Sequence, residues 1–204
     1  AHVNAAMTVL IILVLVYTIL GGMVSVIITD YLQFVVLSLG LIAACLLALR
    51  EVGWTTVVDT VAMVHGNAGF DPLDESGFGP SYVIWMIFTA GLVSCAVWQT
   101  AVMRACAAES TAVARKLYIW SSIGFMIRFL LPQFLGVCAL AYMWIHPEAR
   151  QLLFDPGGNI VADSELTLQV FPVFLSQILP VGLIGLVGAA MLAAFMSTHD
   201  SYLL

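Results

Sequence analysis

Long runs of apolar residues are the feature that most constrains this chain. Of its 204 residues, 62% are hydrophobic and only 9% carry a charge. A soluble domain has about a quarter of its residues charged, whereas a membrane-spanning helix needs roughly 20 predominantly apolar residues. The sequence therefore predicts an all-α, multi-spanning membrane helical bundle that the lipid bilayer solvates over much of its length.

The apolar runs divide at glycine pairs and at polar segments. The expected spans cover approximately 5–20, 23–49, 82–103, 117–145 and 173–204, the last of them broken near Pro172 and Pro180. We treat residues 1–204 as a single transmembrane fragment. Because the chain starts with Ala rather than Met and stops inside an apolar stretch, we expect further sequence on both sides.

The distribution of charge predicts the orientation of these spans. The link 104–116 carries three of the six Lys and Arg residues, whereas the segments 50–81 and 146–172 hold nine of the twelve acids. Cytoplasmic loops collect Lys and Arg. We therefore expect 104–116 and 21–22 to be cytoplasmic links, and the two acidic segments to be external loops of a multi-pass protein in the inner or plasma membrane.

Three charged residues fall inside the expected spans: Asp30, Arg128 and Asp200. Charge in a span is expensive, so each is a functional candidate. Asp30 is alternatively an acid near a helix N-terminus that faces the headgroups. Arg128 is either a buried structural cation or a substrate-facing one, because its planar fork can hold a carboxylate or polyol. Pro132 cannot donate to the carbonyl of Arg128, which leaves an acceptor at the same depth.

The last span carries a short face of oxygen groups. Ser197 and Thr198 follow Ala194 by three and four residues, so their hydroxyls lie over its carbonyl. Three neutral oxygens on one face can replace part of the water shell of a small cation. Ser and Thr in membrane helices also commonly bond back to the carbonyl one turn earlier. The spacing alone leaves both interpretations open.

Several function classes find no support in the sequence. The Lys and Arg residues are too few and too scattered to bind nucleic acid. The four cysteines show no CxxC spacing, and no span holds a His/Glu metal motif or a Ser/His/Asp set. We therefore expect neither an enzyme nor a bound cofactor.

Three stretches match one family of membrane transporters in order and spacing. The segment 17–33 carries a tyrosine, a Gly-Gly pair, a Thr-Asp pair and a glutamine. The segment 99–110 carries a glutamine, an arginine and Ala-Ala-Glu-Ser. The segment 179–201 carries Leu-Pro, Ala-Ala and Met-Ser-Thr followed by Asp-Ser. These stretches resemble the sodium/solute symporter family, which contains the sodium–glucose, proline, pantothenate and iodide cotransporters. The resemblance covers nearly the whole chain.

The resemblance implies a fold of two inverted five-helix repeats, of which this chain would supply core helices four to eight. It implies that the carbonyl of Ala194 and the hydroxyls of Ser197 and Thr198 form one side of a site for Na⁺, the co-transported ion. Asp30 matches an acid thought to help sodium leave toward the cytoplasm. Our hypothesis is that Asp30 and Asp200 together make the inward exit electronegative.

The candidate solute contacts lie on two other spans. Arg128 aligns with a lysine that contacts sugar in the bacterial sodium–sugar members of the family. Gly91 and Ser94 stand where those carriers have an asparagine and a gating tyrosine, and Gln99 is a further candidate contact. The differences at Gly91 and Ser94 argue against a hexose as the solute, and the guanidinium of Arg128 favours a carboxylate-bearing solute.

The resulting interpretation is sodium-coupled symport of a small polar solute, with the solute, sodium and the lipid bilayer as partners. Two alternatives stay open. One is a proton-coupled carrier of the same fold that uses Asp30 or Asp200 as its proton site. The other is a transporter-like membrane sensor fused to a histidine kinase.

Overall fold

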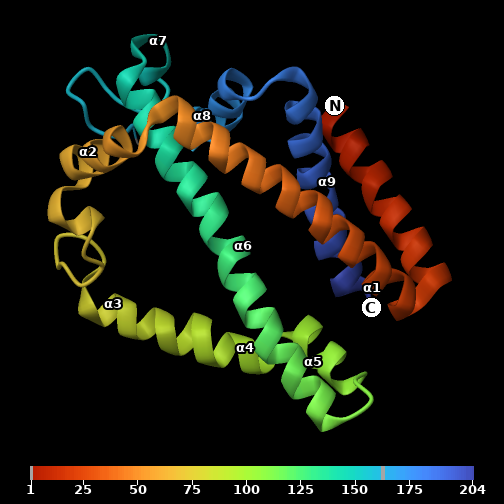
Figure 1. Cartoon of the computed structure of the whole chain (residues 1–204). Coiled ribbons are helices and arrows are strands. Elements are labelled where there is room, and N and C mark those ends of the chain that lie inside the picture. Colours follow the sequence, from red (N-terminus) through yellow and green to blue (C-terminus); the bar gives the residue numbers. More distant parts are fainter. Residues whose placement is uncertain (1, 162–163) are drawn as a thin grey trace. The chain divides into compact units, whose positions relative to one another are not determined.

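The computed structural model describes residues 2–161 and 164–204, and these residues form helices joined by turns (Figure 1). Phe154 and Ile160 add an isolated antiparallel bridge. The prediction of an all-α chain is confirmed. The elements are α1 (His2–Val52), α2 (Trp54–His65), the 3-10 helix η1 (Gly66–Gly69), α3 (Gly79–Met86), the π-helix η2 (Ile87–Val93), α4 (Ser94–Val97), α5 (Gln99–Cys106), α6 (Thr111–Ile145), α7 (Pro147–Arg150), α8 (Ser164–Ile178) and α9 (Val181–Leu203).

The chain divides into two compact units. The first unit comprises Ala1–Ala43 and Pro180–Leu204, and the second comprises Ala44–Leu179. The first unit therefore consists of most of α1 together with α9. The second unit holds the end of α1 and the helices α2 to α8, with α6 as its longest element.

Three of the described helices are long and apolar enough to cross a membrane. They are Asn4–Val52, Thr111–Ile145 and Val181–Leu203, and a shorter apolar helical stretch runs over Gly79–Val93. Many large apolar side chains on these helices are exposed, among them Leu20, Ile84 and Val181. An outward apolar surface on helices with internally satisfied backbones is what a hydrocarbon environment requires.

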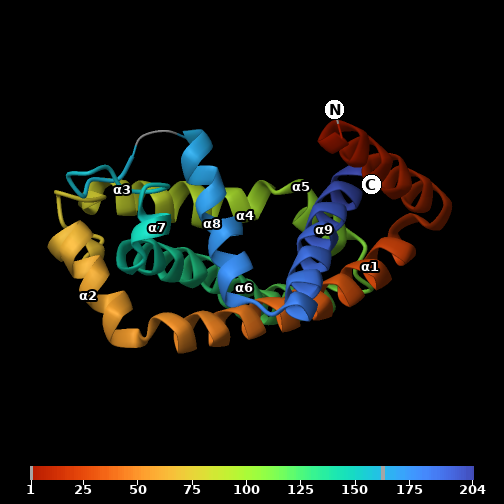
Figure 2. The same cartoon turned by 90° about the horizontal axis from the view of Figure 1, so that it is seen from above.

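Gly22 divides α1 into two helical segments. A straight helix of 51 residues would be about 75 Å long, more than twice the roughly 30 Å of a bilayer core. At Gly22 the backbone has φ 56° and ψ −158°, values that only glycine adopts readily. The helix turns back sharply there, as Figures 1 and 2 show at the junction of its red and orange parts. This residue lies in the link that the sequence predicts at 21–22.

The segment expected to form the third span, 82–103, is built from several short pieces. It runs through α3, the π-helix η2, α4 and α5, and it breaks at Trp98, whose φ of −66° and ψ of 112° are extended. The expected external loop 146–172 contains α7 and the first part of α8, and Pro180 separates α8 from α9. The bounds at which each segment enters and leaves the bilayer stay predictions.

Aromatic contacts hold the second unit together around α6. Trp54 at the start of α2 stacks on Phe134 with ring centroids 6.4 Å apart, and Tyr142 lies 5.3 Å from Phe174 of α8. Phe174 and Leu135 are buried. Aromatic pairs at such separations stabilise by about 0.5–1.5 kcal/mol beyond the area they bury. These contacts connect α6 to the helices on both sides of it in sequence.

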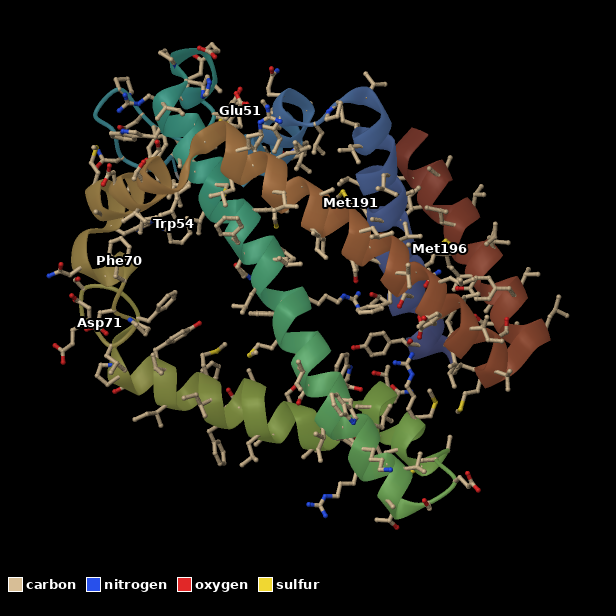
Figure 3. The ribbon with its side chains drawn as sticks, viewed as in Figure 1. Glu51, Trp54, Phe70, Asp71, Met191 and Met196 are labelled. Carbon is tan, nitrogen blue, oxygen red and sulfur yellow. The ribbon has the colours of Figure 1, made fainter. Side chains whose placement is uncertain are left out.

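The segments expected outside the membrane contain acids held in their ionised form by local hydrogen bonds. The pKa of Asp74 is lowered because the hydroxyl and backbone N–H of Ser76 both donate to it. The pKa of Asp155 is lowered because the backbone N–H of Asn159 donates to its carboxylate. Asp71 lies on the same α2–α3 connection as Asp74 (Figure 3). Because their pKa values are lowered, Asp74 and Asp155 keep their negative charge in more acidic medium than an ordinary aspartate does.

We expect Gly22→Ala to destabilise the full-length protein by about 1–3 kcal/mol, because alanine is strained at this positive φ. The matched control is Gly136→Ala in α6, where an added Cβ meets no atom within 4 Å. Alanine there should be neutral or stabilising by up to about 1 kcal/mol. Unfolding of both variants in detergent measures the difference. Equal stability of the two variants would show that the turn at Gly22 does not depend on glycine.

Candidate functional site

The first unit contains a set of polar side chains that we call the inner cluster: Tyr17, Asp30, Gln33, Asp200 and Ser201. The Tyr17 hydroxyl donates to Oδ2 of Asp200 over 2.6 Å. Gln33 shares a side-chain hydrogen bond with Tyr17, and Asp30 lies close enough to Tyr17 and Asp200 to interact with both electrostatically. The structure therefore brings together Asp30 and Asp200, the two residues predicted to line the ion exit.

Asp200 is the most enclosed member of the inner cluster. Its side chain is 0% exposed, and the hydroxyl of Ser201 lies 3.4 Å from Oδ1. The first unit contains no Lys or Arg in its sequence. Neutral donors thus replace water around this carboxylate, and no fixed basic side chain within the unit balances its charge. An enclosed carboxylate in this setting has a large desolvation cost.

Two local features of the sequence place these side chains on facing helices. The turn at Gly22 returns α1 alongside itself, so that Tyr17 before the turn and Gln33 after it reach one another. Farther along α1, a Cβ added at Gly40 would lie 3.5 Å from the Cβ of Ala190 in α9. This close approach of small residues lets α9 pack directly on α1, as small residues do between membrane helices.

The predicted sodium ligands lie together on α9. The Thr198 hydroxyl donates to the carbonyl of Ala194 over 2.8 Å, and Ser197 is half-buried while Thr198 is exposed. The back-bonded arrangement that the sequence allowed is therefore the one observed. It also places two oxygens side by side, and the lone pairs of the Thr198 hydroxyl stay available to a cation because its hydrogen points to the carbonyl.

The predicted sodium ligands and the inner cluster follow one another along the same helix. Asp200 comes six residues after Ala194, which is about 9 Å along a helix axis. The two groups point to different faces of α9, because six residues turn an α-helix by about 240° and Thr198 is exposed whereas Asp200 is buried.

The predicted solute contacts all lie in the second unit and are all exposed. Gly91 belongs to η2, Ser94 begins α4, Gln99 begins α5 and Arg128 lies in α6. The first three thus stand on either side of the helix break at Trp98. Within residues 2–161 and 164–204, Arg128 makes no ion pair or hydrogen bond, so its guanidinium is open to a ligand or to another part of the protein.

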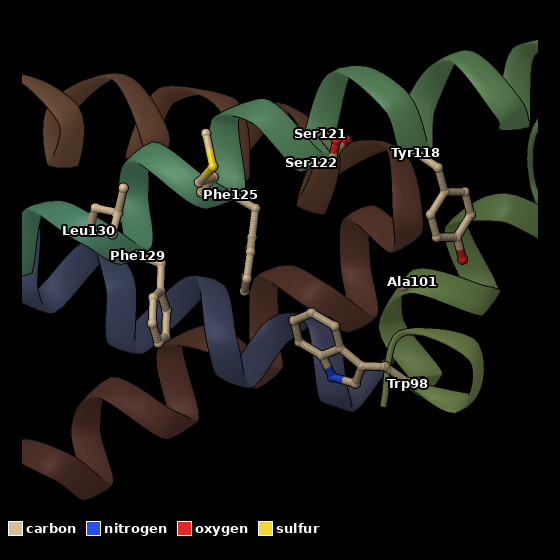
Figure 4. Close-up of a pocket in the computed structure, with 9 residues that line it drawn as sticks. Trp98, Ala101, Tyr118, Ser121, Ser122, Phe125, Phe129 and Leu130 are labelled. Carbon is tan, nitrogen blue, oxygen red and sulfur yellow. The ribbon is translucent and has the colours of Figure 1, made fainter. Parts of the chain in front are cut away.

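A cavity of about 430 Å³ lies beside two of these candidates (Figure 4). Trp98, Phe125 and Phe129 point into it from the helix break and from α6. The lining is almost wholly apolar and includes the neighbours of Gln99 and Arg128 rather than these residues themselves: Trp98, Ala101, Tyr118, Ser121, Ser122, Phe125, Met126, Phe129 and Leu130.

Sequence reasoning gave no role to Tyr17, Gln33, Ser201 or Trp98. Tyr17 and Gln33 stand in the stretch that resembles the symporter family, but Tyr17 is 183 residues away from its partner Asp200. No local pattern links positions so far apart. Trp98 lies within an apolar run that reads as one continuous helix, and it carries no glycine or proline signal at the break.

An all-helical chain with apolar helices of membrane-spanning length and a buried carboxylate is that of an integral membrane protein. The chain belongs to the sodium:solute symporter family, whose model matches residues 1–204. The predicted family membership is confirmed.

Two relatives extend this finding. Sodium/glucose cotransporter 4 of Mus musculus is 28% identical over 218 residues, which cover 95% of this chain and 30% of that protein. Its Homo sapiens counterpart is 27% identical over 218 residues, with 95% and 31% covered. The chain thus spans about 30% of the length of the relatives it matches. No solved structure matches the chain.

Proposed function

We propose that these residues are part of a carrier in which sodium moving down its gradient drives a small polar solute inward across the plasma membrane. The observation that carries this proposal is the family match over all 204 residues. Each positive charge that crosses about 100 mV gains roughly 2.3 kcal/mol, which is a sufficient source of driving force. The function is transport, with no covalent chemistry on the solute.

The oxygen face of α9 is the proposed sodium contact of this chain. The Ala194 carbonyl and the Thr198 hydroxyl already lie 2.8 Å apart, and Ser197 is on the adjacent face. Oxygen groups that are held in place lose little freedom when they replace the water shell of an ion. Further ligands would come from another segment, because one helix face supplies only one side of a coordination sphere.

We expect the double variant Ser197→Ala with Thr198→Val to lower the apparent sodium affinity of the full-length protein at least tenfold. Loss of two oxygen ligands leaves the cation partly desolvated without compensation. Binding of radioactive sodium to the purified protein measures this, and it needs no knowledge of the solute. Ser176→Ala is the matched control, because Ser176 is an exposed residue of α8 that donates a similar bond to the carbonyl of Val173 at 2.7 Å. Unchanged sodium affinity in the double variant would remove this face from the site.

The inner cluster is the proposed inward exit for sodium. Its carboxylates at Asp30 and Asp200 interact electrostatically in a unit without Lys or Arg. A path lined by negative charge attracts a cation and lowers the free-energy cost of moving it through a low-dielectric region.

We expect Asp30→Asn and Asp200→Asn each to slow sodium efflux from proteoliposomes severalfold, because each removes negative charge from the exit. Asp59→Asn is the control, since Asp59 is an exposed acid on α2. Efflux of radioactive sodium from vesicles that contain the full-length protein gives the rates. If both variants released sodium as fast as the parent protein, the exit would lie elsewhere.

Arg128 supports a proposal about the solute. Its guanidinium is exposed and makes no bond among the described residues, and it can bind a carboxylate in a bidentate manner. The names of the two similar proteins refer to glucose as their solute. In this chain Gly91 and Ser94 offer no side chain that could hold or cover a hexose in the way an asparagine and a tyrosine can. We therefore favour a carboxylate-bearing solute.

Competition assays with hexoses and with small carboxylates, on the full-length carrier, should show preference for a carboxylate. Arg128→Gln should then weaken carboxylate uptake at least tenfold, as expected for loss of a charge-assisted bidentate contact. Arg128→Lys keeps the charge without the fork and should lie between the two. A clear preference for hexoses would refute this assignment and leave the sodium coupling intact.

A further inference from the structure

The cavity of the second unit and Arg128 share one part of α6. Phe125 and Phe129 line the cavity, and Arg128 directly precedes Phe129 and follows Phe125 by three residues. Residues three apart on a helix are neighbours, with Cβ atoms about 5–6 Å apart. Ser121, another lining residue, lies about two helical turns before Arg128 and on nearly the same side of α6. Arg128 therefore borders the part of α6 that lines the cavity.

The cavity and Arg128 require opposite chemistry from one ligand. The lining of the cavity is almost wholly apolar, and the hydroxyl of Ser122 already donates to the carbonyl of Ile119 at 2.7 Å. Charged or hydroxyl groups of a ligand would lose their bonds to water there without replacement. The guanidinium of Arg128 makes no ion pair or hydrogen bond within residues 2–161 and 164–204, and it suits a carboxylate. A ligand that fits both carries a carboxylate at one end and an apolar group at the other.

The side chains that point into the cavity favour an aromatic group over an aliphatic one. They include the rings of Trp98, Phe125 and Phe129 (Figure 4). The rings of Phe125 and Phe129 stack on one another, with centroids 6.2 Å apart and planes inclined by 21°. A third ring can add to such a stack, and aromatic pairs stabilise beyond the area that they bury. The cavity of about 430 Å³ is in the range of roughly 300–1,000 Å³ that is typical of sites for small molecules.

We propose that this cavity binds the aromatic end of the transported solute while Arg128 binds its carboxylate. The inference rests on the proposed function, because it names the class of solute that the carrier moves: a small carboxylate that bears an aryl group. Trp98 is then a specificity-determining residue, since it contributes its ring to the lining from the helix break. The ligand binds as its anion, and no covalent step is involved.

Three carboxylates separate the contributions of charge, apolar area and aromatic stacking. They are propanoate, cyclohexylpropanoate and phenylpropanoate, and isothermal titration calorimetry on the purified full-length protein measures their affinities. Phenylpropanoate should bind about tenfold tighter than propanoate or more, because its ring leaves water for an apolar site. It should also bind about twofold tighter than cyclohexylpropanoate or more, because a saturated ring has no aromatic face to stack on its neighbours.

Variants of the lining test whether the ring enters this cavity. Ala101→Leu fills part of it and should weaken phenylpropanoate at least tenfold and propanoate much less; the matched control is Ala112→Leu, at an exposed position of α6 outside the lining. Trp98→Leu should abolish the preference for phenylpropanoate over cyclohexylpropanoate. Its control is Trp120→Leu, because Trp120 is 72% exposed and outside the lining. Arg128→Gln should weaken all three ligands by a similar factor, since it removes the contact that they share.

Equal affinity for propanoate and phenylpropanoate would overturn the proposal, and that result is expected if lipid or another segment of the protein fills the cavity. Tighter binding of the cyclohexyl ligand than of the phenyl ligand would also overturn it. If Trp98→Leu fails to fold, Ala101→Leu decides alone. Titrations with and without sodium test the proposed function separately. A gain from the phenyl ring that sodium leaves unchanged refutes sodium coupling and leaves the aromatic site standing, whereas sodium-enhanced binding without this gain refutes the aromatic site only.

Discussion

The hydrogen bond between Tyr17 and Asp200 is the interaction on which the first unit depends most. It joins the segment of α1 before Gly22 to the end of α9, and it is the short, 2.6 Å contact through which an enclosed carboxylate recovers part of the hydration it has lost. A neutral donor meets this need only in part, because burial of a negative charge among apolar helices is costly. The cost that remains is the physical reason for proposing that a sodium ion passes this carboxylate.

Two glycines shape the first unit around that contact. Gly22 turns the chain back within one residue, and Gly40 lets α9 approach the segment of α1 after the turn, near Ala190. Both positions serve the same end by different means, one through its backbone dihedral angles and the other through the absence of a side chain. The oxygen face of α9 and the inner cluster then occupy successive turns of one helix.

The helical class and a helix break at the Gly-Gly pair could be expected from the sequence, because apolar run length and paired glycines are local signals. The joint role of Asp30 and Asp200 at an ion exit was a hypothesis from the resemblance to the symporter family, and it stays a prediction. The partner of Asp200 could not be predicted, since no local rule pairs residues 183 positions apart. The break at Trp98 was also missed. Its extended backbone falls in an apolar run whose composition is that of a continuous helix, and packing rather than propensity sets it.

The two segments of α1 meet at Gly22 with no loop residues between them. If they opened or closed by a small angle as rigid helices, each residue would move in proportion to its distance from Gly22. Tyr17 lies about 8 Å from it along its segment and Asp30 about 12 Å, whereas Ala43 lies about 31 Å away. A small change in the angle at Gly22 would therefore move the far ends of the two segments by several ångströms, whereas residues close to Gly22, such as Tyr17 and Asp30, would move much less.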